Sequence, residues 1–201
     1  MIHRTIMQPS AAIDSPAQAK FVAMLRAAHG LESRTKGERL EQVLDAYHAQ
    51  LAAQGLAWIR RVGTPTKVLG AVKSDRRGRR VFQAAFDGEQ GADFVGIDAR
   101  GLHVAVEAKT HAGRDAWDSG IDPGGDAAEW GALSSRQWDE VRRAEMLGGT
   151  GMVILEAFGR VWSIHPSALV RHVAAAGRRT VRHCEIHTFA RPLVGVAWWS
   201  D

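Results

Sequence analysis

Cysteine is almost missing from this chain of 201 residues, in which Cys184 is the only one. A single thiol excludes an internal disulfide, the usual support of small secreted domains. We therefore expect a protein of a reducing compartment, with Cys184 serving as a small buried hydrophobic residue.

Long apolar runs are also missing. No stretch approaches the roughly 18 consecutive apolar residues that a membrane-crossing helix needs. The first 20 residues lack the continuous apolar core of a signal peptide. These absences predict a cytoplasmic protein with no membrane partner. Hydrophobic residues still make up 45% of the chain, which is enough for a globular core.

Positive charge is concentrated in one short segment. The whole chain carries a formal net charge of +4, whereas residues 60–80 hold eight basic residues and one acid, a net charge of +7. Such concentration is typical of a surface that binds a polyanion. We predict two β-arms over residues 64–86 around a basic tip. The candidate DNA-binding residues in it are Lys67, Lys73, Arg76, Arg77, Arg79 and Arg80.

Hydrophobic periodicity predicts interleaved helices and strands after a weakly ordered or helical segment at 1–32. Residues 33–201 form one domain, in which 111–131 is rich in Gly, Asp and Ala and predicts a flexible loop. Helices are expected over 35–54, 134–147 and 166–176. Strands are expected over 56–62, 92–97, 102–110, 151–158 and 160–165, with extended segments at 181–189 and 193–199. This order predicts an α/β or α+β sheet covered on at least one face.

Charged side chains share one face of the strand expected at 102–110. Because strand side chains alternate between faces, Glu107 and Lys109 project together from the sheet. Asp93 precedes Glu107 by 14 residues, which is enough for two strands and a tight turn. We therefore expect the two carboxylates to become neighbours across a hairpin.

A pair of neighbouring carboxylates favours a cation. At about 4 Å two such charges repel by roughly 4 kcal/mol at an effective dielectric near 20. Mg²⁺ prefers carboxylate oxygens and activates water for phosphodiester hydrolysis. An ammonium on the same face, that of Lys109, can orient the nucleophile or offset developing charge. The alternative is a solvated strand face, on which Glu-x-Lys triplets are common.

The pattern of Asp93, thirteen residues and then Glu107-Ala108-Lys109 resembles the PD-(D/E)XK nucleases. Further segments extend the resemblance, in chain order KGERLE, TPT with the basic arm, ADFVGID, VEAKT, SSRQWDEV and GGTGMVILEAF. Together they resemble the RecU-type Holliday junction resolvases over residues 36–169, about two thirds of the chain.

This resemblance implies roles for particular residues. Asp93 and Glu107 match the metal-binding acids of the family, and Lys109 matches its transition-state lysine. Gln137 matches a glutamine that completes the metal site, and Glu41 matches a catalytic glutamate in the first helix.

The resemblance also implies an architecture and a substrate. The fold would be α/β, with a restriction-endonuclease-like core of mixed β-sheet flanked by helices. The arm at 64–86 would be a protruding basic stalk. The protein would be a homodimer that uses Mg²⁺, or Mn²⁺ in its place, and cuts four-way junctions in branched DNA by paired nicks.

The chain departs from the family at Gly91, where the family has a threonine counted as a metal ligand. The loop between Lys109 and Gln137 is also longer than usual. Two alternatives therefore stay open. One is a nuclease of the same superfamily acting on ordinary duplex or single-stranded DNA. The other is a catalytically inactive junction-binding protein.

Overall fold

The structure is a computed structural model that describes residues 36–63, 66–68, 73–74, 80–81, 84–86, 91–128 and 131–193. Side chains are described throughout these ranges except at 36–37, 66–68, 73–74, 80–81 and 84–86. The segment expected at 1–32 lies outside the described residues.

A mixed six-stranded sheet is the centre of the fold, in the order β1-β6-β7-β9-β10-β12. Its strands are β1 (Ala57–Arg61), β6 (Phe94–Asp98), β7 (His103–Thr110), β9 (Thr150–Ala157), β10 (Arg160–Ile164) and β12 (Arg191–Pro192). Only β7 and β9 pair in parallel, and the other neighbours in this sheet are antiparallel. The expected α/β class with a mixed sheet flanked by helices is confirmed.

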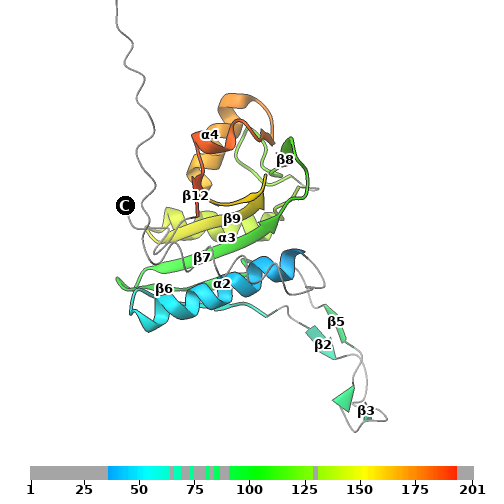
Figure 1. Cartoon of the computed structure of the whole chain (residues 1–201), viewed down its shortest axis with the longest axis vertical. Helices are drawn as coiled ribbons and strands as arrows, with labels where there is room; N and C mark the ends of the chain where they lie inside the picture. The colour runs from blue at the N-terminus through cyan, green and yellow to red at the C-terminus, as the bar shows by residue number, and fades with distance from the viewer. Residues whose placement is uncertain are drawn as a thin grey trace, which may run out of the picture.

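Helix α2 (Lys36–Ala53) covers one face of the sheet (Figure 1). Its apolar residues recur every three or four positions, so that they form one stripe. Leu40, Leu44 and Leu51 on this stripe are at most 1% exposed. They pack on Phe94 of β6, Val104 and Val106 of β7, and residues of β9.

Helices α3 (Ser135–Met146) and α4 (Pro166–Ala176) belong to the core on the other face. Ser134 caps α3: its hydroxyl accepts the Gln137 backbone N–H, and the Gln137 side chain accepts the Ser134 N–H. This reciprocal capping fixes where α3 begins and holds the Gln137 side chain at its N-terminus.

The flexible loop expected at 111–131 is wrong in part. Strand β8 (Ala116–Asp118) pairs antiparallel with β11 (Thr180–Arg182), far along the chain. Trp117 and Ile121 are 2% and 0% exposed. Burying these two apolar side chains orders a segment whose Gly and Asp content favours turns.

The extended segment expected at 181–189 is also wrong in part. After β11 the chain turns and forms a 3-10 helix, η1 (Ile186–Thr188), which buries Ile186. Cys184 lies in the preceding turn and is exposed, so its expected burial is wrong. Most of the segment expected at 193–199 lies outside the described residues.

Two short antiparallel ladders lie outside the main sheet. Strands β2 (Thr66–Val68) and β5 (Ala84–Phe86) form one, and β3 (Lys73–Ser74) and β4 (Arg80–Val81) form the other (Figure 1). The backbones of Lys67, Lys73 and Arg80 lie on these strands, whereas Arg76, Arg77 and Arg79 fall outside the described residues. In the described part of the chain, no helix is both long and apolar enough to cross a membrane.

Candidate active site

The second half of β7 places two charged side chains on the face that α3 covers. Val104 and Val106 pack toward α2, so Glu107 and Lys109 project to the opposite side. Glu107 is completely buried, and Lys109 Nζ lies 2.8 Å from Glu107 Oε1. The expected shared face of these two residues is therefore confirmed.

Asp93 meets this pair just before β6 begins. Its Oδ2 accepts the Ala108 backbone N–H at 2.9 Å, and Glu107 Oε2 accepts the Asp93 N–H at 3.2 Å. Each carboxylate thus takes a backbone donor beside the other, beyond the last paired residues of β6 and β7. The structure brings Asp93, Glu107 and Lys109 together as the sequence predicts, while their catalytic role stays a prediction.

Burial makes both carboxyl groups weak acids. It raises the pKa of Glu107 to about 8, and the negative charge of Asp93 adds to this rise. Burial also raises the pKa of Asp93, against hydrogen bonds from Ala108 and Glu107 and the charges of Lys109 and Arg61. The pair therefore favours holding a proton, or a bound cation, over carrying two negative charges.

The oxygen atoms of this cluster suit a hard divalent cation. Glu107 Oε1 is enclosed and forms an ion pair with the Lys109 ammonium 2.8 Å away. Mg²⁺ is commonly held by one or two carboxylates, with water and substrate phosphate completing the shell. The described residues contain no group of three or more His, Cys, Asp or Glu arranged for a metal ion. Asp93 and Glu107 therefore supply the acids for such a site as a pair.

Gln137 contacts the cluster through Lys109. Its Oε1 accepts the Lys109 ammonium at 3.0 Å and the Ser134 backbone N–H at 3.1 Å. A carbonyl oxygen has two lone pairs, so both are engaged in this arrangement. Its metal-binding role stays a prediction, and it requires that at least one of these hydrogen bonds is given up.

Glu41 contacts Arg61 of β1 rather than the carboxylate pair. The two form an ion pair, and Arg61 also lies 3.7 Å from Asp45. The positive charge of Arg61 lowers the pKa of Asp93, opposing the effect of burial. Glu41 is thus connected to the site through the arginine that faces Asp93, and its catalytic role stays a prediction.

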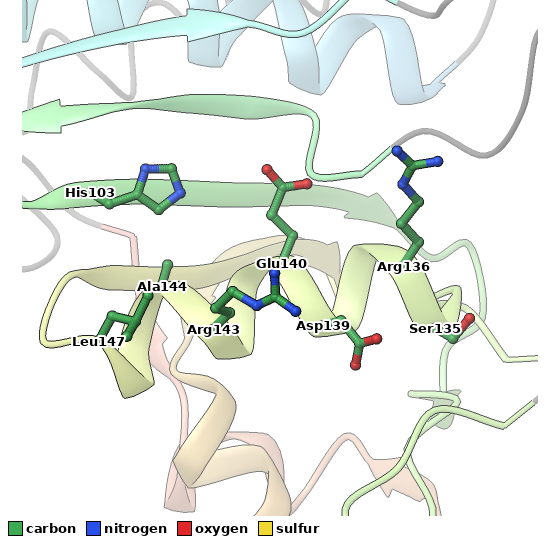
Figure 2. A pocket seen from close by; sticks show the side chains of 8 residues that line it. All are labelled: His103, Ser135, Arg136, Asp139, Glu140, Arg143, Ala144 and Leu147. Atoms are coloured by element: carbon green, nitrogen blue, oxygen red, sulfur yellow. The ribbon is translucent and has the colours of Figure 1, made fainter.

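Glu140 is a component that the sequence did not reveal. It points from α3 toward the start of β6, as Figure 2 shows, and its Oε2 accepts the Ala92 backbone N–H at 2.9 Å. A Cβ atom on Gly91 would lie 1.8 Å from the same oxygen. A side chain at position 91 would therefore displace the Glu140 carboxylate from the space that it occupies.

Helix α3 thereby supports both halves of the site. Gln137 and Glu140 are one helical turn apart and lie on the same side of the helix. The first holds the Lys109 ammonium, and the second holds the backbone directly before Asp93. No local sequence signal marks Glu140, because its role depends on how α3 is rotated against the sheet.

A pocket of about 430 Å³ lies along α3 beside this support. Figure 2 shows its lining, in which Arg136 and Glu140 extend from the helix past β7 while His103 projects from β7 itself. No family model matches this chain, and no curated protein matches it either.

Proposed function

We propose that this protein is a metal-dependent DNA endonuclease of the PD-(D/E)XK type. The observation that carries the proposal is the pair of a partly buried Asp93 and a completely buried Glu107, with the Lys109 ammonium 2.8 Å from Glu107. Complete burial of a carboxylate costs free energy. Acids with shifted pKa values beside a positively charged side chain are characteristic of catalytic sites.

The roles of the residues follow from their positions. Asp93 and Glu107 would hold Mg²⁺ or Mn²⁺. When bound, such an ion lowers the pKa of the attacking water and offsets charge on the phosphate. Lys109 orients the water and stabilises the transition-state charge, and Gln137 holds the lysine in place. The water oxygen bonds to phosphorus, one P–O ester bond breaks, and the departing alcohol oxygen takes up a proton.

The preferred substrate in this proposal is a four-way DNA junction. The resemblance to the RecU-type resolvases and the +7 charge of residues 60–80 support it. The main sheet would be a restriction-endonuclease-like core, and residues 64–86 would be its basic stalk. A homodimer would place two sites for paired nicks, since two-fold symmetry matches two equivalent strands.

A cleavage assay tests the activity. Wild-type protein is mixed with an end-labelled four-way junction, or a duplex of the same sequence, in Mg²⁺ and separately in Mn²⁺. Glu107→Gln and Lys109→Ala should each cut at least about 100-fold more slowly, while junction binding is largely kept. His103→Ala is the matched control, because this exposed side chain shares the face of β7 but lies outside the cluster. Tight binding without cutting under either metal would show an inactive junction-binding protein.

Removing part of the arm tests the substrate. Deleting residues 73–80 should reduce junction cutting more than duplex cutting. Equal rates on both substrates before and after the deletion would show a nuclease for ordinary DNA and would end the resolvase proposal.

A further inference from the structure

A second groove begins where β7 ends. It has a volume of about 740 Å³ and includes Thr110, the residue after Lys109. The segment that follows β7, the β9–β10 turn, Arg39 of α2 and His183 line it. The groove therefore adjoins the candidate active site along the chain and is separate from the pocket beside α3.

Three rings form a row in this groove. The Phe158 ring stacks on His183, with centroids 4.7 Å apart and planes inclined by 20°. His111 approaches the same phenyl ring edge-on at 6.0 Å. His111 Nε2 is enclosed and has no hydrogen-bond partner among the described residues. The row thus combines aromatic faces with an unused polar atom.

Phe158 holds this position in an unfavourable backbone conformation. Its φ is 56°, the only positive value at a non-glycine residue in the described part of the chain, and the next residue, Gly159, has a φ of 75°. A two-residue hairpin turn with both φ values positive favours Asn followed by Gly. Phenylalanine at the first position is unusual, and such residues gather at ligand-binding sites.

The charged side chains that line the groove balance in formal charge, two arginines against two acids. The Arg39 guanidinium is ion-paired with Glu156. Arg114 is exposed and forms no ion pair among the residues that the structure describes. Asp115 balances it in formal charge, so the rings contribute more to the attraction than net charge does.

We propose that this groove binds unpaired nucleotides of the DNA strand next to the scissile phosphate. A base would extend the row of His111, Phe158 and His183, and Arg114 would contact a backbone phosphate. Stacking on aromatic side chains with a neighbouring arginine is the usual mode of single-strand binding. The inference rests on the proposed nuclease function, because it identifies the partner of the groove as that enzyme's substrate.

Binding of fluorescein-labelled oligo(dT) to the full-length protein, measured by anisotropy in EDTA, tests the proposal without cleavage. Phe158→Asn removes the ring and places at this position the residue that the turn prefers, so the backbone is retained. It should weaken binding at least about fivefold, the lower range for loss of one base–aromatic stack. Arg114→Ala should reduce the log–log salt slope by about 0.7.

Two controls make the result decisive. Arg171→Ala removes an exposed arginine of α4 that does not line the groove, and it should change neither value. Urea unfolding of Phe158→Asn checks that the variant is folded. Unchanged oligo(dT) binding in folded Phe158→Asn and Arg114→Ala would overturn the proposal, even if the wild type cuts DNA. If the variants bind oligo(dT) more weakly while the wild type never cuts DNA, the groove is supported and the nuclease function is overturned.

Discussion

The two faces of the β6–β7 hairpin are built from alternating residues of the same strands, yet their environments differ. Toward α2, Phe94, Val104 and Val106 are completely buried in an apolar layer. Toward α3, Glu107 is buried to the same extent but is a carboxyl group beside an ammonium. Equal burial therefore stabilises the fold on the α2 face and costs free energy on the α3 face.

The comparison shows how the fold tolerates its site. Apolar burial on the α2 face stabilises the sheet, with each large side chain contributing about 1.5–3 kcal/mol. Burial of Glu107 costs free energy, which the surrounding hydrogen bonds and the Lys109 charge only partly offset. Apolar burial on the α2 face thus offsets the free-energy cost of burying Glu107 on the α3 face.

The largest expected effect on stability comes from the α2 face. Leu44→Ala removes a side chain that is 0% exposed and should lower the free energy of unfolding by about 2–5 kcal/mol. Urea denaturation measures this change. Cleavage per folded molecule should stay within about twofold of the wild type, since Leu44 lies across the sheet from the acids. A parallel loss of specific activity in fully folded protein would show that the two faces are not independent.

A pH series on metal-free protein sharpens the comparison on the α3 face. The pKa of Glu107 is raised from 4.5 to about 8 by folding, so the folded protein keeps a proton that the unfolded chain releases between these values. The free energy of unfolding should therefore fall as pH rises through this window. Glu107→Gln lacks this contribution and should melt a few degrees higher than the wild type at pH 8, as roughly 2–4 °C corresponds to 1 kcal/mol.

Calorimetry at pH 5 and pH 8 makes the measurement. The difference in melting temperature between Glu107→Gln and the wild type should widen toward pH 8. His103→Ala should show no such widening. Identical pH dependence in Glu107→Gln and wild type would mean that Glu107 does not hold its proton in the folded state.

The smallest expected effect concerns the support from α3. Gly91→Ala places a Cβ 1.8 Å from Glu140 Oε2, which displaces the acceptor of the Ala92 N–H. The loss should be about 1 kcal/mol in stability, the net value of one hydrogen bond, with slower cleavage because Asp93 follows Ala92. Glu140→Gln keeps an acceptor oxygen and should retain most activity.

A double-mutant cycle isolates this contact. In the Glu140→Ala background, Gly91→Ala should cost almost nothing more, because the clashing carboxylate is gone. Urea unfolding and cleavage rates of the four proteins provide the readout. Additive effects would show that Gly91 and Glu140 act separately.

The helices, most strands and the juxtaposition of the acids could be predicted from the sequence. Helix α2 and the hairpin of β6 and β7 have strong local patterns, and alternation alone places Glu107 beside Lys109. The sequence does not predict strand β8, because its order depends on pairing with β11, about 60 residues later in the chain. Local Gly and Asp content predicts a loop and carries no information about that partner.

The support of the site could not be predicted, for a related reason. The sequence shows Gly91 only as a departure from the family threonine, since the carboxylate beside it belongs to Glu140, 49 residues away. The metal-binding role of Gln137 stays a prediction, and the sequence did not reveal that its oxygen accepts hydrogen bonds from Lys109 and the Ser134 N–H. Both contacts depend on the rotation of α3 about its axis, which hydrophobic periodicity defines only to within a face.

The Val62 backbone N–H donates to the Asp93 carbonyl at 2.7 Å, where the chain leaves β1 and where it returns toward β6. Residues 63–91 thus leave the sheet after Val62 and return to it before Asp93, and one hydrogen bond joins these two points. On the returning side a pull acts first on the Ala92 N–H that Glu140 accepts, and then on Asp93. A ligand that pulls on this segment would therefore shift the Asp93 carboxylate through the backbone.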